Sequence, residues 1–85
     1  MVWGRVIAEN SSNNSFFASM DGSVEAIWDL TQSAAWLWDQ VSARGGSDPS
    51  VFYLNAGYHT LRIAQRETGA RVDRILITSD LSYQP

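Results

Sequence analysis

The residues best suited to chemistry in this chain are its aromatic rings. Four tryptophans occur in 85 residues, and two of them, Trp36 and Trp38, are separated by a single leucine. An indole offers a large, flat, apolar face with one N–H donor, which suits a hydrophobic core or a ligand platform equally well. The same face fits the C–H face of a pyranose ring. Ligand binding, core packing and contact with a partner are therefore the roles open to these two rings.

Groups that could catalyse a reaction are sparse. His59 is the only histidine and there is no cysteine, so the usual zinc sites, with several nitrogen or sulfur ligands, are excluded. No nucleophile motif accompanies His59, and an imidazole bonded to backbone near a turn is the favoured interpretation. Glu67 and Asp73 suggest a glycosidase pair, but they flank a turn, and nine acidic residues give many accidental pairs. We expect no enzymatic activity.

The charge and the hydropathy of the sequence argue against two classes of partner, nucleic acids and membranes. The net charge is −3 and all six basic residues are arginines. Arginines favour hydrogen bonds of fixed geometry, whereas lysines more often provide a non-specific positive surface. Nucleic-acid binding needs a basic face, so we expect no nucleic acid as partner. No apolar run approaches the roughly 20 residues that span a bilayer, so we expect no membrane either. The first five residues lack the layout of a signal peptide.

The elements that must position these residues are strands. Short runs of β-branched and aromatic residues, separated by Gly, Asn, Ser, Asp and Pro, predict one antiparallel all-β domain over residues 1–85. Asp21-Gly22 predicts a hairpin, because glycine tolerates positive φ. Residues 31–38 could form a helical turn, but the Trp36/Trp38 spacing favours a strand or an extended loop. The predicted strands cover residues 2–8, 15–20, 23–29, 37–43, 50–55, 59–65 and 72–78.

Residues 57–80 carry the most specific pattern, a Gly57-Tyr58-His59-Thr60-Leu61 strand, a Glu67-Thr68-Gly69 turn and an Asp73-Arg74-Ile75 strand. Weaker pieces match upstream in the same order: Trp3-Gly4-Arg5, Ser15-Phe16-Phe17, Met20-Asp21-Gly22 and Trp36-Leu37-Trp38. On these motifs the chain resembles the galactose-binding-like jelly rolls of carbohydrate-binding modules. It is similar to the last two-thirds of such a module, whose usual length is roughly 120–150 residues. The resemblance implies an antiparallel β-sandwich of jelly-roll type.

The first strands of these modules have no counterpart here. The chain is either a fragment, or it restores the missing strands by pairing with another copy, because uncovered sheet edges invite pairing. Ile75 and Ile77 share one face of their predicted strand and Leu76 lies on the other, so both faces need cover. We expect a homo-oligomer that completes the sandwich.

The resemblance also implies site residues. Trp36 stands where these modules place a sugar-stacking aromatic on a loop, with core packing as the alternative, and Trp38 stands where they place a core ring. Arg71 stands where they often carry an asparagine that bonds sugar hydroxyls. An arginine can donate to hydroxyls or to a uronic carboxylate, although a solvated turn arginine is the favoured interpretation.

Asp73 is the one candidate metal ligand. The resemblance implies a structural calcium, but calcium takes about six to eight oxygens and one carboxylate is not a site. A salt bridge to Arg5, Arg62 or Arg74 is the favoured role of Asp73. No other cofactor is expected.

Two functions follow. The first is a non-catalytic carbohydrate-binding module that recognises a poly- or oligosaccharide through Trp36 and Arg71; the resemblance alone then suggests an extracellular location. The second is a stand-alone oligomeric assembly protein, built on a truncated jelly roll that has lost sugar binding.

Overall fold

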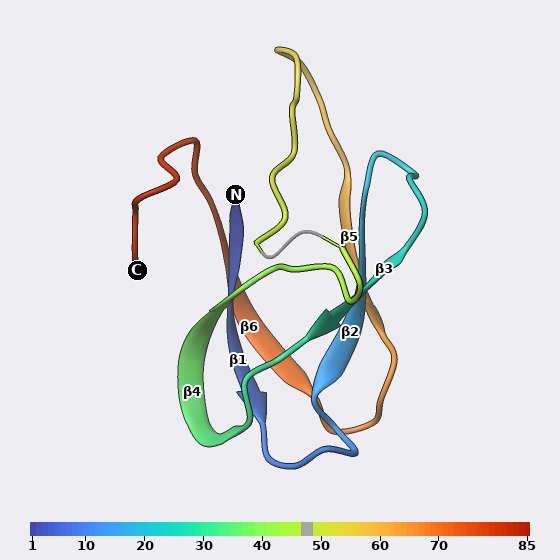
Figure 1. Cartoon of the computed structure of the whole chain (residues 1–85), viewed down its shortest axis with the longest axis vertical. Helices are drawn as coiled ribbons and strands as arrows, with labels where there is room; N and C mark the ends of the chain where they lie inside the picture. The colour runs from blue at the N-terminus through green and yellow to red at the C-terminus, as the bar shows by residue number, and fades with distance from the viewer. Residues whose placement is uncertain (47–48) are drawn as a thin grey trace.

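The computed structural model describes residues 1–46 and 49–85, and in those residues it contains six strands and no helix. The strands form two three-stranded antiparallel sheets, ordered β4-β1-β6 and β3-β2-β5 (Figure 1). The predicted all-β antiparallel sandwich is therefore confirmed. The bounds are β1 (Val2–Ala8), β2 (Ser15–Met20), β3 (Ala26–Asp29), β4 (Ser33–Gln40), β5 (Leu61–Gln65) and β6 (Arg71–Ile77).

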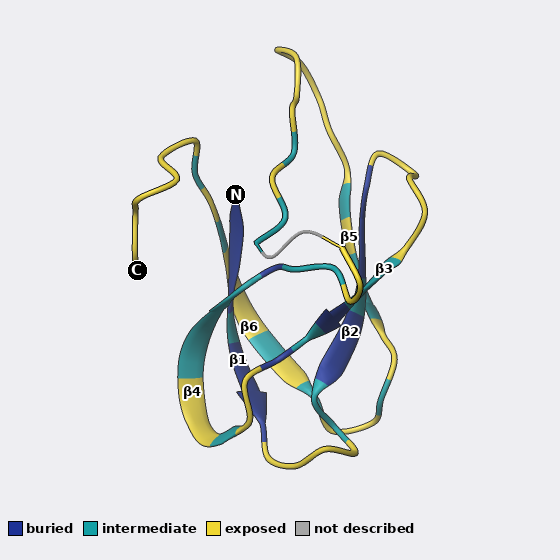
Figure 2. Ribbon diagram, viewed as in Figure 1, coloured by how far each residue is buried: buried dark blue, intermediate teal, exposed yellow. Residues whose placement is uncertain are grey.

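The core lies between the two sheets and centres on Trp28 of β3. Trp28 is fully buried, and the centroid of its ring lies 5.8 Å from the ring centroid of Phe16 on β2. Gly4 of β1 lies directly against the Trp28 ring, where a Cβ would overlap Cη2 and lie 3.2 Å from Cζ2. Buried residues are concentrated on the two central strands, β1 and β2 (Figure 2). Each of these strands has a neighbour on both sides, and apart from Arg5 and Phe17 all of their residues are buried.

Several local predictions are confirmed. The structure gives β1 and β2 the predicted bounds. Asp21 and Gly22 have φ values of 53° and 72°, and the Ser23 amide donates to the Met20 carbonyl at 3.1 Å, so the hairpin between β2 and β3 forms as expected. Residues 31–38 contain no helical turn, because β4 runs through most of them.

Other boundaries were wrong. The predicted strand over residues 50–55 does not form; Phe52 packs against the core, whereas Tyr53 is 94% exposed. The strand predicted over 37–43 lies earlier, so that Trp36 belongs to β4 and not to a loop. The strand predicted over 23–29 begins only at Ala26, the one over 59–65 at Leu61, and the last strand is shifted by one residue.

The periphery of the fold consists of irregular segments. Residues 49–60 project beyond the sheets at the end where β1 begins (Figure 1). None of the described residues belongs to a helix long and apolar enough to cross a membrane.

Candidate functional site

The register of the β4-β1-β6 sheet gathers aromatic and basic side chains on its outer face. Val6 is fully buried in the core, so its neighbour Arg5 points to the opposite face. Trp38 of β4 and Arg74 of β6 lie on either side of Arg5. We call this surface the Trp–Arg face; it consists of Arg5, Trp36, Trp38, Arg71 and Arg74.

Arg5 lies at the centre of the Trp–Arg face. Its guanidinium carbon is 5.3 Å from the ring centroid of Trp36, and its Nη1 donates to Asp73 Oδ2 at 3.1 Å. A cation–π contact of this kind contributes about 0.5–1 kcal/mol at an exposed site. Trp36 nevertheless remains 37% exposed. The indole is therefore held in place and still open to a ligand.

The structure places the predicted site residues on one sheet. Trp36 comes from β4, whereas Arg71 and Asp73 come from β6, with β1 between them. Arg71 is exposed and lies opposite Ile7, on the same face as Arg5. Trp38, by contrast, is not the core ring that the resemblance implies, because it lies opposite Arg5 on the outer face and is only half-buried.

The Asp73 carboxylate serves an ion pair. Of the three salt-bridge partners considered from sequence, the structure selects Arg5. Asp73 sits where β6 shifts register against β1, between the residues paired with Arg5 and Val6. Within residues 1–46 and 49–85, no three His, Asp or Glu side chains lie close enough together to hold a metal ion. The residues around Asp73 therefore do not fit a structural calcium.

The other candidate catalytic groups are separately engaged. Glu67, on the turn between β5 and β6, accepts hydrogen bonds from Ser15 Oγ at 2.6 Å and from the Asn14 amide at 3.2 Å. These bonds, with that from Ser15 the larger cause, lower the pKa of Glu67. Glu67 thus joins the start of β2 to the β5–β6 turn, while Asp73 pairs with Arg5.

His59 fastens the projecting 49–60 segment to the β2–β3 hairpin. Its Nδ1 lies 2.6 Å from Asp21 Oδ2, and its Nε2 lies 2.6 Å from the Asn55 carbonyl oxygen. Because both neighbours are acceptors, both ring nitrogens are satisfied when the imidazole is doubly protonated. The Thr60 amide adds a bond to Asp21 Oδ1 at 2.7 Å. The expected backbone-bonded imidazole is therefore confirmed.

We call the contacts of His59 with Asp21 and Asn55 the His59 clamp. The clamp predicts that the stability of the fold depends on pH. The bonds to Asn55 and then Asp21 raise the pKa of His59, and the bonds from Thr60 and then His59 lower the pKa of Asp21. The His59 contribution is complete below the ordinary imidazole pKa of about 6.5 and is lost as pH rises through the raised value. The Asp21 contribution is complete above about pH 4 and is lost on acidification.

We therefore expect the melting temperature to be highest near about pH 5–6 and to fall as the pH rises above the ordinary imidazole pKa of about 6.5. His59→Gln should lower the melting temperature at pH 5.5 and flatten the profile above that pH. Differential scanning calorimetry of both proteins at several pH values measures this. A wild-type profile that is as flat as that of the variant would contradict the clamp.

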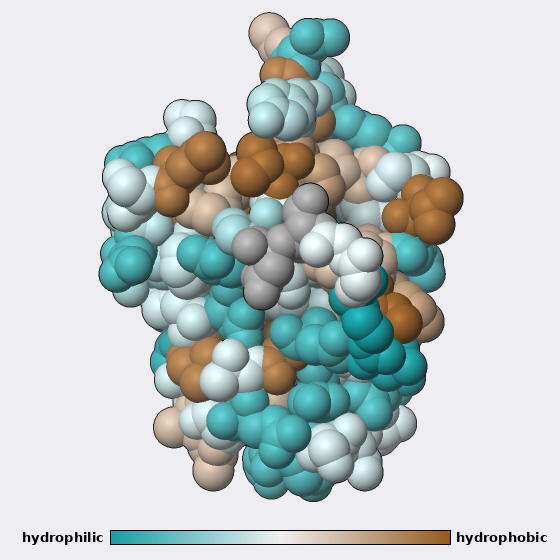
Figure 3. Space-filling model, in the orientation of Figure 1, coloured by the Kyte–Doolittle hydropathy of each residue, from teal (hydrophilic) through white to brown (hydrophobic). Residues whose placement is uncertain are grey.

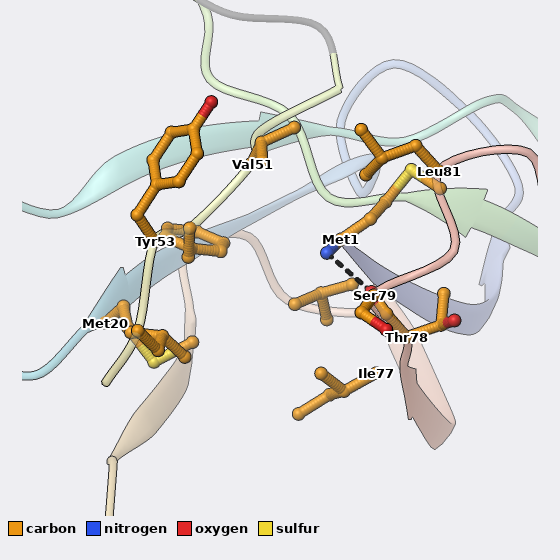
Figure 4. A pocket seen from close by; sticks show the side chains of 11 residues that line it. Met1, Met20, Val51, Tyr53, Ile77, Thr78, Ser79 and Leu81 are labelled. Atoms are coloured by element: carbon orange, nitrogen blue, oxygen red, sulfur yellow. Dashed lines mark hydrogen bonds between the residues drawn. The ribbon is translucent and has the colours of Figure 1, made fainter. Parts of the chain in front are cut away.

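A second feature is an apolar cavity of about 370 Å³ at the end of the sandwich where β1 begins (Figure 4). It is lined by the start of β1, by Met20, by residues 51–54 and by residues 77–79 and Leu81. Tyr53, Ile77 and Leu81 at its margin are 94%, 61% and 61% exposed. Hydrophobic residues gather at this end of the molecule, below the projecting segment (Figure 3). The lining holds no charged side chain, which suits an apolar partner better than a sugar.

The residue that sequence reasoning missed is Arg5 as the centre of the site. Its signal was available, because an arginine interrupts the otherwise apolar run of Val2–Ala8.

Comparisons of the chain with protein-family models, with curated proteins and with solved structures found no match. The Trp–Arg face and the apolar cavity are therefore the starting points for function.

Proposed function

We propose that the chain is a non-catalytic carbohydrate-binding module that binds a poly- or oligosaccharide on the Trp–Arg face. The observation that carries this proposal is the accessible Trp36 ring, oriented by Arg5 beside further hydrogen-bonding groups. The similarity of the closing motif, residues 57–80, to galactose-binding-like jelly rolls supports it independently, and only that similarity suggests an extracellular location.

The physical case rests on preorganisation. An aromatic ring that is already fixed loses little conformational freedom when a pyranose stacks on it, so more of the stacking energy appears as affinity. Arg5 provides donors for the oxygen atoms of a sugar at the edge of the stacked ring, and Arg71 and Arg74 provide donors further along the face, for a neighbouring sugar. A stacking surface surrounded by polar groups is the combination that an amphipathic sugar requires.

Trp36→Ala tests this function. We expect the variant to lose about tenfold in affinity for a bound polysaccharide, which corresponds to about 1.4 kcal/mol of stacking energy. Affinity electrophoresis in gels that contain different polysaccharides measures the loss. Tyr58→Ala is the matched control, because Tyr58 is a fully exposed aromatic on the projecting segment. Equal retention of wild type and Trp36→Ala, with both folded, would remove the assigned site.

A second function, self-association, is favoured by a different observation. β6 is an edge strand, hydrogen-bonded to β1 alone among the described strands. Its inward-facing Ile75 and Ile77 are 41% and 61% exposed, whereas Leu37 and Ile63 on the edge strands β4 and β5 pack against the core. An exposed apolar edge strand is a ready template for another strand.

The sequence of β6 points to a second copy of the chain as the partner. If two β6 strands pair antiparallel with Asp73 of one opposite Arg74 of the other, Val72 falls opposite Ile75. This register gives two opposite-charge pairs on the outer face and two apolar pairs on the inner face. In the resulting six-stranded sheet, the exposed Ile75 of each copy would pack against Val72 of the other.

Light scattering over a dilution series tests the association. We expect a dimer at micromolar concentration for the wild type and a folded monomer for Ile75→Lys, because an inward-facing charge opposes edge pairing. Val24→Lys is the control, since Val24 is 93% exposed in the β2–β3 hairpin loop. A wild type that stays monomeric at all concentrations would contradict this function.

A further inference from the structure

The arginines of this protein differ in whether a carboxylate balances their charge. Of the six, four form an ion pair with a carboxylate: Arg5 with Asp73, Arg44 with Asp29, Arg62 with Glu25, and Arg66 with Glu67. Across residues 1–46 and 49–85, Arg71 and Arg74 have no carboxylate within ion-pair distance. Both belong to β6 and both lie on the Trp–Arg face.

The Trp–Arg face is therefore locally positive in a protein whose net charge is −3. It carries Arg5, Arg71 and Arg74, and Asp73 is the one carboxylate paired with any of them in the described residues. Arg5 and Arg74 are direct cross-strand partners. Like charges in that position destabilise a sheet. Asp73 offsets the charge of Arg5, and a bound anion would supply the counter-charge that Arg74 lacks.

The hydrogen-bonding capacity of the face points to the same ligand. A guanidinium has donors only, and Asp73 already accepts from Arg5. A neutral sugar presents hydroxyls that both donate and accept, whereas carboxylate and sulfate groups only accept. The planar fork of an arginine binds a carboxylate through two parallel hydrogen bonds.

The spacing of the strands separates the two kinds of contact. β4 and β6 flank β1, so the Trp36 strand and the Arg71 strand are about 10 Å apart. That distance exceeds the width of one pyranose ring. A ring stacked on Trp36 would therefore leave the arginines of β6 to bind an acidic group on a neighbouring sugar of the same chain.

We infer that the ligand of the Trp–Arg face is an acidic glycan, a chain of sugars that carries carboxylate or sulfate groups, with Arg71 and Arg74 as its anion-binding residues. This inference rests on the proposed carbohydrate binding and specifies its ligand class. Trp36 provides stacking, Arg71 and Arg74 provide charge recognition, and Arg5 positions Trp36.

The experiment compares polygalacturonate with its methyl ester, which has the same backbone without the charge. By isothermal titration calorimetry at low salt, we expect the wild type to bind polygalacturonate at least tenfold more tightly. The double variant Arg71→Gln/Arg74→Gln should lose that preference. Arg44→Gln/Arg62→Gln is the charge-matched control, because those arginines are paired with carboxylates of the other sheet region, and it should keep the preference.

The outcomes separate the two proposals. Equal, Trp36-dependent binding of both polymers would overturn the acidic-glycan inference and leave carbohydrate binding standing. Binding of neither polymer, nor of alginate as a second acidic glycan, would overturn both. Equally tight binding of polyaspartate that is insensitive to Trp36→Ala would show attraction to polyanions in general, and would also overturn the inference.

Discussion

Replacing Trp28 with alanine should lower the free energy of unfolding by about 3–5 kcal/mol, the usual loss for a large aromatic residue removed from a core. Trp28 is fully buried and lies between Phe16 of β2 and Gly4 of β1, so its ring joins the two sheets. A chain of 85 residues has a total stability of about 4–13 kcal/mol. The substitution therefore removes a large share of that total.

Chemical denaturation followed by far-ultraviolet circular dichroism measures the loss. Trp36→Ala is the matched control, since it removes the same side chain from a partly exposed position on the Trp–Arg face. We expect its unfolding midpoint to stay close to that of the wild type. Similar midpoints for the two variants would contradict the central role of Trp28 in the core.

The second large effect concerns the contact between Gly4 and Trp28. Gly4→Ala should destabilise the fold by about 1–3 kcal/mol, because the added methyl group overlaps the fully buried ring of Trp28. The atoms nearest to that methyl position are Cη2, Cζ2 and Cζ3, all in the six-membered ring of the indole. A smaller ring at residue 28 should leave room for the methyl group.

Trp28→Phe is therefore expected to rescue Gly4→Ala. The Trp28 Nε1 is buried and has no hydrogen-bond partner among the described residues, so phenylalanine also removes an unsatisfied donor. In the Trp28→Phe background, the alanine should be neutral or stabilising, since it reduces the entropy of the unfolded chain. A double-mutant cycle should give a coupling of at least about 1 kcal/mol. Additive losses would show that the two residues do not share this space.

The part of the fold that could be predicted depends on local alternation. Phe16, Ala18 and Met20 alternate on one face of β2, so its bounds followed from the period of the residues. β1 is buried on both faces, and its bounds followed from its run of apolar residues. Asp21-Gly22 identified its hairpin because two residues with positive φ are needed there. The error at residues 50–55 has a physical reason. That segment has the composition of a strand, but β-propensity forms a strand only where a partner ladder is available.

The site was only partly predictable, because its geometry depends on strand order. Arg5 and Asp73 are 68 residues apart in the sequence, and they meet because β1 and β6 are neighbours. Trp36 and Arg71 were identified as candidates, whereas the placement of both on one outer face requires the register of three strands. The excess positive charge on β6 could not be predicted, because it depends on which carboxylate pairs with each of the other four arginines in the folded chain.

The pairing of β1 with β6 also constrains the order of events during folding. Val2 lies opposite Ile77, and the Met1 carbonyl accepts a bond from the Thr78 amide at 3.0 Å. β1 therefore pairs with β6 only after the two ends of the chain have come together. Closing so long a loop slows folding, as in other proteins dominated by non-local contacts. A circular permutant that joins residue 85 to residue 1 through a short linker would make this pair local in the sequence. Its refolding rate should exceed that of the natural strand order, although the two proteins would share the same strand pairing.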